Sequence, residues 1–224
     1  MKIFLIRHGE SRQNTKENYT EGLPDHKVRL TEEGLAEANE AGIFLVNYIN
    51  EHNIDLSHAR LWVSPYTRTR QTATEINKHL RIRDVKEDIT LIEQRYGLFS
   101  DKEIELIKQM YPNEFAHYDN YYQNEGKFYA VLPQGEAPFD VALRTKQFID
   151  TIFRDDNDPL FVVSHGTTIK TFILNWMHYS PEWFAYDKTM NNCAIRLITR
   201  DDNTKQSTEE YIYGGPKLTL KKKD

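Results

Sequence analysis

A short phrase occurs twice in this chain, as an apolar run that ends in Arg-His-Gly near the N-terminus and in Ser-His-Gly far downstream. The two runs cover residues 3–9 and 160–166, and their histidines are His8 and His165. Each run is too short for a helix and too continuous for a half-exposed strand, which predicts strands covered on both faces. Ligands of open α/β sheets gather at the carboxyl ends of such strands. We therefore expect both histidines in one shared site.

Charged side chains at other predicted element ends indicate what this site does. Arg7 precedes the first histidine, Arg68 lies early in a predicted helix, and Glu93 follows another apolar run. A guanidinium group donates two parallel hydrogen bonds to phosphoryl oxygens and stays charged at every relevant pH. The backbone amides after His165, at a predicted helix N-terminus, add donors for an anion. Two histidines, a carboxylate and fixed arginines predict a centre that reacts with phosphate.

The elements that must position these residues alternate between strands and helices along the first half of the chain. Thr31 can cap a helix whose first turn holds Glu32 and Glu33, which favour the positive end of the helix dipole. We predict further elements at residues 60–63 (strand), 65–80 (helix) and 89–92 (a third strand that ends at Glu93).

The second half continues the alternation and predicts the fold class. The expected elements are an aromatic-rich helical stretch at 101–123 broken by Pro112, helices at 139–153 and 167–177, and strands at 193–198 and 210–213 that can form an antiparallel edge. We predict an α/β fold, a single-domain three-layer α/β/α sandwich over residues 1–224, with a mostly parallel central sheet. The helical insertion, at about residues 100–134, is expected to cover the active site.

Composition limits the class of protein. The 224 residues are 39% hydrophobic, Cys193 is the only cysteine, and the formal net charge is −5. One cysteine forms no intrachain disulfide and no four-thiolate zinc site. No signal-peptide pattern or long apolar run occurs, so we expect a cytoplasmic protein that binds neither membrane nor nucleic acid. A homodimer is compatible with the sequence, which does not define the oligomeric state.

Five motifs in order resemble the histidine phosphatase superfamily, also called the phosphoglycerate mutase-like family. They are Arg7-His8-Gly9-Glu10-Ser11 with Asn14, Leu30-Thr31 with Gly34, Ser64-Pro65-Tyr66-Thr67-Arg68 followed by Gln71-Thr72-Ala73, Glu93 with Gly97, and Ser164-His165-Gly166. The resemblance extends from about Lys2 to Ile198.

The resemblance implies a mechanism without metal or other cofactor. His8 would be the nucleophile and form a phosphohistidine, so its attacking nitrogen must be neutral. Glu93 would protonate the leaving oxygen and then take a proton from water. The other implied residues bind the phosphoryl group: Arg7, Arg68 and His165 around its charge, and Asn14, Gly166, Thr167 and the loop residue Thr20 as further contacts.

Several residues have a plainer interpretation. Arg70 fits a surface position better than the site. His8, His165 and Glu93 have the residue types of a metal site, although Arg7 and Arg68 would repel a cation. The remaining aromatic residues of the insertion are expected to pack in a core or lid, with one or two at the substrate entrance: Phe115, Tyr118, Tyr121, Tyr122, Phe128 and Tyr129.

Three functions stay open, and the resemblance favours the phosphatase branch. Glycolytic mutases of this family carry paired arginines in their insertion, whereas residues 100–134 contain none, and Thr167 stands where the mutases usually have Asn. Lys170 stands where an arginine is common. We therefore expect a metal-independent phosphomonoester hydrolase acting on a small phosphorylated metabolite. The alternatives are a primer-dependent phosphoglycerate mutase and a non-catalytic phospho-ligand binding module, although Glu93 is not needed for simple anion binding.

Overall fold

The two apolar runs form neighbouring central strands of a six-stranded sheet. The computed structural model describes residues 1–15 and 23–215. The strand order is β3-β2-β4-β1-β5-β6, in which β1 to β4 are mutually parallel and β5 and β6 add an antiparallel edge. The strands are β1 (Lys2–Arg7), β2 (Arg60–Val63), β3 (Asp84–Glu87), β4 (Leu160–Ser164), β5 (Ile195–Arg200) and β6 (Ser207–Tyr213). The predicted mostly parallel sheet and its antiparallel edge are confirmed.

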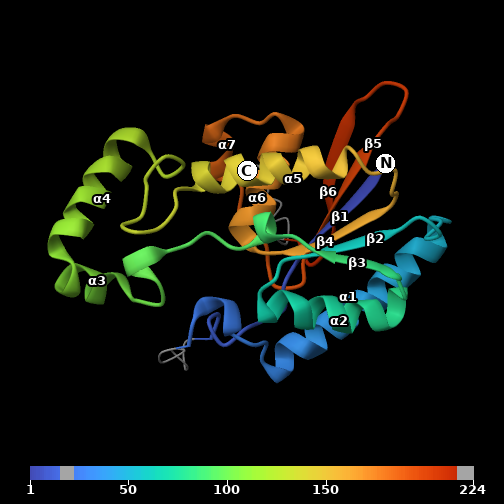
Figure 1. The fold of residues 1–224 in the computed structure, drawn as a ribbon, viewed down its shortest axis with the longest axis horizontal. Coiled ribbons are helices and arrows are strands. Elements are labelled where there is room, and N and C mark those ends of the chain that lie inside the picture. The colour runs from blue at the N-terminus through green and yellow to red at the C-terminus, as the bar shows by residue number, and fades with distance from the viewer. Residues whose placement is uncertain (16–22, 216–224) are drawn as a thin grey trace, which may run out of the picture.

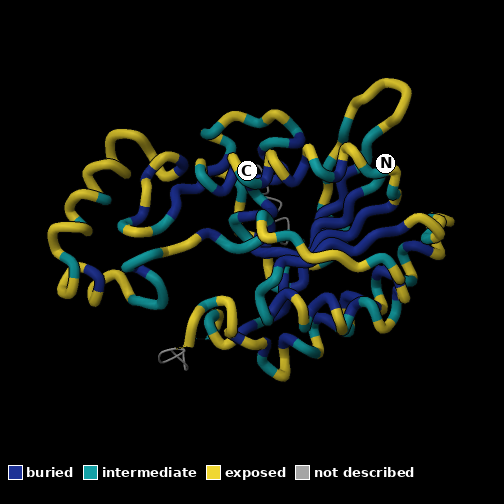
Figure 2. The backbone as a smooth tube through the Cα atoms, in the orientation of Figure 1, coloured by how far each residue is buried: buried dark blue, intermediate teal, exposed yellow. Residues whose placement is uncertain are grey.

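Helices cover both faces of this sheet, which confirms the three-layer prediction (Figure 1). Because side chains alternate along a strand, Phe4 and Ile6 of β1 face one layer while Ile3 and Leu5 face the other. The first layer consists of α1 (Glu32–Glu51) and α2 (Thr67–Leu80), and the second contains α5 (Pro138–Ile152) and α6 (Gly166–Met177), with the short α7 (Pro181–Tyr186) beside it. The central strands β1, β2 and β4 are buried between the layers, as Figure 2 shows.

The start of α1 is fixed against the loop that follows β1. As predicted, Thr31 caps the helix: its hydroxyl accepts a hydrogen bond from the Gly34 amide at 3.0 Å. A Cβ atom on Gly34 would lie 2.0 Å from the Glu10 carbonyl oxygen, and one on Gly9 would lie 2.3 Å from the Gly34 oxygen. Only glycine permits this approach of two backbones, which holds the loop after His8 in place.

The predicted third strand at 89–92 is wrong. Residues Ile89–Leu91 form a 3-10 helix, η2, and the strand lies earlier, at Asp84–Glu87. Asp88 caps this turn by accepting a hydrogen bond from the Thr90 amide at 2.8 Å, and Leu91 is buried in the core. The true edge strand is mostly exposed, so it lacks the apolar run that marks a central strand. Glu93 therefore follows a helical turn and does not close a strand.

The insertion consists of two helices that stand beside the sheet, α3 (Ile104–Met110) and α4 (Pro112–Glu125). The predicted break at Pro112 is confirmed, because this proline begins α4. Most insertion residues are exposed (Figure 2), and a small cluster of Phe99, Ile107 and Leu132 packs beneath them. Two 3-10 helices, η1 (Asp25–Lys27) and η3 (Gly97–Phe99), border the region between the insertion and the sheet.

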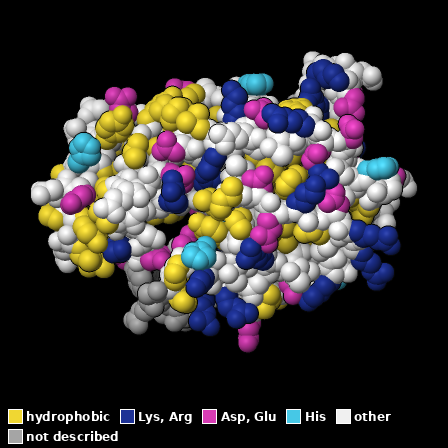
Figure 3. All heavy atoms as spheres, viewed as in Figure 1, with side chains coloured by type: hydrophobic (Ala, Val, Ile, Leu, Met, Phe, Trp, Pro, Cys, Tyr) yellow, Lys and Arg dark blue, Asp and Glu magenta, His cyan; other side chains and the backbone are white. Residues whose placement is uncertain are grey.

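The surface carries mixed charge. On the face shown in Figure 3, lysine and arginine side chains are interspersed with aspartate and glutamate. Among the helices in residues 1–15 and 23–215, none has the length and apolar character needed to cross a membrane.

Candidate active site

Strand pairing brings His8 and His165 together. Arg7 of β1 lies opposite Ser164 of β4, and the His8 amide donates a hydrogen bond to the Ser164 carbonyl at 3.0 Å. The two imidazoles therefore lie side by side, with ring centroids 5.1 Å apart and an interplanar angle of 64°. The shared site expected from the repeated phrase is present in the structure.

The His8 ring is held in the tautomer that a nucleophile needs. Its Nδ1 lies 2.8 Å from the Gly9 carbonyl oxygen. Because a carbonyl only accepts, Nδ1 carries the proton and Nε2 keeps its lone pair. Burial lowers the pKa of His8 well below 6.5, and the positive charges of Arg68 and Arg7 lower it further. The imidazole is consequently neutral at physiological pH.

His165 is buried against a serine at the end of β2. Its Nε2 lies 2.9 Å from the Ser64 hydroxyl oxygen. The pKa of His165 is also well below 6.5, first because the ring is buried and then because Arg68 and His8 lie near it. Its Nδ1 is buried and makes no hydrogen bond within the described residues. This nitrogen is therefore free to meet a bound group beside His8.

Two arginines, one at the end of β1 and one at the start of α2, supply fixed positive charge. Arg68, in the first turn of α2, is 2% exposed and donates to the Asp25 carboxylate at 2.7 Å. Arg7, at the end of β1, donates to the Met190 carbonyl, and burial lowers its pKa. These contacts fix both guanidinium groups, yet neither Nε forms a hydrogen bond with any residue that the structure describes. A buried donor without a partner costs about 1–3 kcal/mol. The two unpartnered Nε–H groups therefore indicate that an oxyanion ligand binds here.

Glu93 lies where the end of η2 meets the start of α6. Its two carboxylate oxygens accept hydrogen bonds from the Gln94 amide at 2.8 Å and the Thr167 amide at 3.4 Å. Tyr96 lines the same cavity, and burial together with the negative charge of Glu93 raises the pKa of Tyr96 to about 12. Tyr96 is thus a protonated phenol that can donate a hydrogen bond beside the carboxylate.

A cavity of about 450 Å³ is bordered by His8, the two arginines, Glu93 and Tyr96. Asn14 lines it, and the Asn14 Oδ1 atom accepts from both the amide (3.0 Å) and the hydroxyl (2.9 Å) of Ser11. This leaves the Asn14 amide NH2 to donate toward a ligand. The cavity is lined by Arg7, His8, Gln13, Asn14, Thr15, Asp25, Arg68, Glu93, Tyr96, Phe99, Asp101, Lys102 and Glu103. Phe99 supplies apolar surface to this lining.

The remaining predicted contacts differ in their placement. Gly166 begins α6, and a Cβ atom added to it would lie 3.8 Å from Arg7 Nε, so the helix N-terminus faces this arginine. Thr167 directs its amide to Glu93 and lines an adjoining cavity. Thr20 lies outside the described residues.

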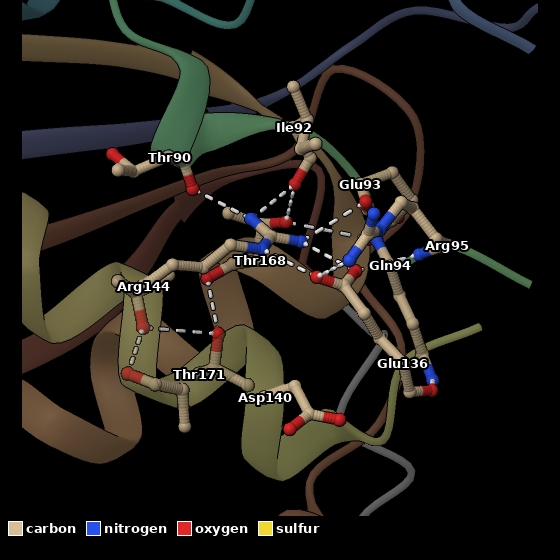
Figure 4. A network of polar contacts seen from close by, with 12 residues as sticks. Thr90, Ile92, Glu93, Gln94, Arg95, Glu136, Asp140, Arg144, Thr168 and Thr171 are labelled. Atoms are coloured by element: carbon tan, nitrogen blue, oxygen red, sulfur yellow. Dashed lines mark hydrogen bonds and ion pairs between the residues drawn. The ribbon is translucent and has the colours of Figure 1, made fainter. Parts of the chain in front are cut away.

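Arg144 and Glu136 were missed by sequence reasoning, and Figure 4 shows the network that they form. Arg144, on α5, donates to the carbonyls of Thr90 (2.6 Å), Ile92 (2.7 Å) and Glu93 (3.1 Å). Its guanidinium group also pairs with the buried Glu136 carboxylate at 3.3 Å. An arginine that binds three carbonyls within four consecutive residues fixes the path of that segment. Arg144 is therefore the positioning residue for Glu93.

No pattern in a single sequence identifies the pair of Arg144 and Glu136, because Arg144 occupies a position that is typical of the exposed face of an amphipathic helix.

The structure places Arg70 at the surface, as its plainer interpretation predicted. Arg70 forms an exposed ion pair with Glu87, with Arg70 Nε 2.6 Å from the carboxylate. Of the aromatic residues in the insertion, Tyr118 lines the adjoining cavity and Phe128 packs in a small core, while Tyr121 is exposed. Within residues 1–15 and 23–215, no group of three His, Cys, Asp or Glu side chains is arranged to hold a metal ion.

Comparison with known proteins identifies the family. The model of the "Histidine phosphatase superfamily (branch 1)" matches residues 3–211. The chain belongs to this superfamily. The chain is an enzyme of the phosphatase-or-mutase class that this superfamily comprises.

Relatives of both activities occur within the superfamily. The chain is 32% identical over 212 residues to the phosphoglycerate mutase-like protein AT74 of Arabidopsis thaliana, covering 88% of this chain and 64% of that protein. It is 30% identical over 171 residues to phosphoserine phosphatase 1 of Hydrogenobacter thermophilus, covering 76% and 73%. The crystal structure of the α-ribazole phosphatase from Shigella flexneri shares the fold, with a TM-score of 0.75, 19% identity, and coverage of 94% and 95%.

Proposed function

We propose that this protein is a phosphomonoester hydrolase that acts through a phosphohistidine on His8, without a metal ion, on a small phosphorylated metabolite. One observation carries the proposal. Around the neutral His8 ring, the Nε atoms of Arg7 and Arg68 and the Nδ1 atom of His165 are buried and have no hydrogen-bond partner among the described residues. Three buried nitrogens beside a free imidazole lone pair match a bound phosphoryl group and its equatorial oxygens.

The first half-reaction transfers the phosphoryl group to the enzyme. The His8 Nε2 lone pair attacks phosphorus, and the bond from phosphorus to the ester oxygen breaks. Glu93, in its protonated form, gives its proton to the departing oxygen. The guanidinium groups of Arg7 and Arg68 offset the negative charge on the phosphoryl oxygens throughout the transfer.

The second half-reaction restores the enzyme. Glu93, now a carboxylate, takes a proton from a water molecule as the water oxygen attacks phosphorus. The nitrogen–phosphorus bond breaks, His8 regains its lone pair, and inorganic phosphate leaves. One water molecule is consumed, and Glu93 ends protonated as it began.

Mutase and binding functions are less well supported. A mutase must hold a phosphorylated acid against the phosphoenzyme, and residues 100–134 contain no arginine to grip its carboxylate. A module that only binds phosphate gains nothing from a carboxylate beside the phosphate site, since like charges repel. Hydrolysis uses every group in the site, including Glu93.

The test is release of phosphate from an aryl phosphate in the presence of a chelator, with acid-labile phosphoprotein trapped by rapid quenching. We expect turnover in the intact protein and none in His8→Ala, while Glu93→Gln forms phosphoprotein that hydrolyses slowly. His58→Ala, at an exposed histidine, is the matched control. Turnover that survives in His8→Ala, or that requires added metal, contradicts the proposal. Phosphate transfer between phosphoglycerates that depends on a bisphosphorylated primer would instead establish the mutase.

A further inference from the structure

A second cavity, of about 270 Å³, lies against the active site. It shares Arg7, Glu93 and Tyr96 with the first cavity, so the proton donor for the leaving oxygen borders both. A group that leaves from the phosphoryl site past Glu93 enters this second cavity. Its volume suits a small metabolite and is too small for a peptide or nucleic-acid strand.

Positive charge dominates the wall of this cavity. The lining includes three lysines, Lys127, Lys170 and Lys188. Among the described residues, its acidic members are Glu93 and Asp187. The Asp187 carboxylate is already bound by the buried Arg196 at 2.9 Å. Arg196 also pairs with Glu209, and a single aspartate can offset at most one of the three lysine charges.

Lys170 is the half-buried member of this group. Its ammonium nitrogen donates to the Asp187 main-chain carbonyl and stands 4.4 Å from the centroid of the Phe184 ring, both of which are uncharged partners. Burial lowers the pKa of Lys170 to about 8, with the charges of Lys127 and Arg196 acting in the same direction and Asp187 against them. A cation in this environment is stabilised by an anion placed in the cavity.

The wall that carries these lysines is held in place. The chain from Asp187 to Met190 forms one side of the cavity, and both ends are tied down. Arg196 binds Asp187, and Arg7 donates to the Met190 carbonyl. Tyr96, Tyr118 and Phe184 add aromatic surface. The cavity thus combines apolar walls with convergent positive charge, as small-molecule sites do.

We propose that this second cavity binds the leaving group of the substrate, and that the leaving group carries a second anionic group, a carboxylate or a phosphate, bound by Lys170 and Lys127. The inference rests on the proposed phosphatase function. It assigns the substrate class as phosphomonoesters of small anionic alcohols.

Three matched substrates test this: propyl phosphate, its analogue that ends in a carboxylate, and its analogue that ends in a second phosphate. Hydrogen bonds to charged groups contribute about 1.5–3 kcal/mol, so we expect at least one anionic analogue to exceed propyl phosphate in kcat/KM by roughly tenfold or more. The better analogue shows which anion the cavity prefers. Lys170→Met and Lys127→Met should reduce this preference, whereas Lys146→Met, at an exposed lysine of α5, should keep it. Equal kcat/KM for the three substrates overturns the inference.

Binding separates this inference from the proposed chemistry. Calorimetric titration of His8→Ala with the same three compounds measures affinity without turnover. Tighter binding of an anionic analogue, lost on combining His8→Ala with Lys170→Met, supports the cavity assignment even if the intact protein hydrolyses none of the compounds. Equal affinities refute the cavity assignment and leave the test of His8 as nucleophile unaffected.

Discussion

Replacing Arg144 with methionine is the sharpest test of how the site is built. The change removes donors to three backbone carbonyls, at Thr90, Ile92 and Glu93, and leaves the Glu136 carboxylate buried with a side-chain exposure of 7%. Breaking a buried ion pair from one side costs about 3–5 kcal/mol. Glu136 still accepts from the Arg95 amide at 2.9 Å. We therefore expect the lower part of that range, about 3 kcal/mol, in the free energy of unfolding measured by urea denaturation.

The same variant tests the positioning of Glu93 separately from stability. A general acid contributes roughly 10²–10⁴-fold to rate, and it matters most when the leaving alcohol is a poor leaving group. We expect Arg144→Met to reduce kcat for propyl phosphate by about tenfold or more, and kcat for nitrophenyl phosphate much less. A purely structural loss of active protein lowers both by the same factor.

Two controls sharpen the interpretation. Arg154→Met, at an exposed arginine after α5, should change neither stability nor the ratio of the two kcat values. Adding Glu136→Gln to Arg144→Met removes the buried charge, which then pairs only with the exposed Arg95 side chain at 3.4 Å, and should recover part of the lost stability without restoring Glu93. Equal losses for both substrates, or a free energy of unfolding unchanged within about 0.5 kcal/mol, would refute the reasoning.

Four further predictions concern protonation and backbone packing. Because burial holds the pKa of His8 well below 6.5, the acid limb of kcat/KM for an aryl phosphate should lie below pH 6.5; a limb at or above 6.5 contradicts a neutral buried nucleophile. The same shift means that the unfolded chain binds more protons, so the free energy of unfolding should fall as pH drops through 6.5 in the intact protein, and fall less in His8→Ala. The preference for an anionic leaving group should decline as pH rises through about 8, where Lys170 loses its proton. A preference that stays constant from pH 7 to 9 argues against a role for this lysine. The charged groups around Lys170 are Arg7, Glu93, Lys127, Asp187, Lys188 and Arg196. Gly34→Ala should destabilise the fold by several kcal/mol, since its Cβ would lie 2.0 Å from a backbone oxygen. Gly166→Ala is the control, because its Cβ would lie 3.7 Å from the nearest side-chain atom. Equal denaturation midpoints for the two variants would contradict this prediction.

Sequence reasoning predicted the site better than it predicted the elements around it. The central strands β1 and β4 are buried on both faces, so their sequences had to be continuously apolar, and the residue after each run is the histidine. The edge strand β3 is exposed and paired on one side, so nothing in Asp84–Glu87 distinguishes it from a loop. The apolar residues at 89–92 were mistaken for it, although Leu91 is buried from a 3-10 turn.

The sequence by itself determined which groups form the candidate site, because His8, Arg7, Arg68, Glu93 and His165 adjoin patterns that local physics fixes: apolar runs and helix starts. Only the tertiary structure decided which residues support them. The contacts of Arg144 with Glu136 and the backbone of the Glu93 segment join positions 8 to 54 residues apart, and the second cavity combines lysines from three separate segments. Such contacts arise where elements pack together, and no local spacing in the chain records them.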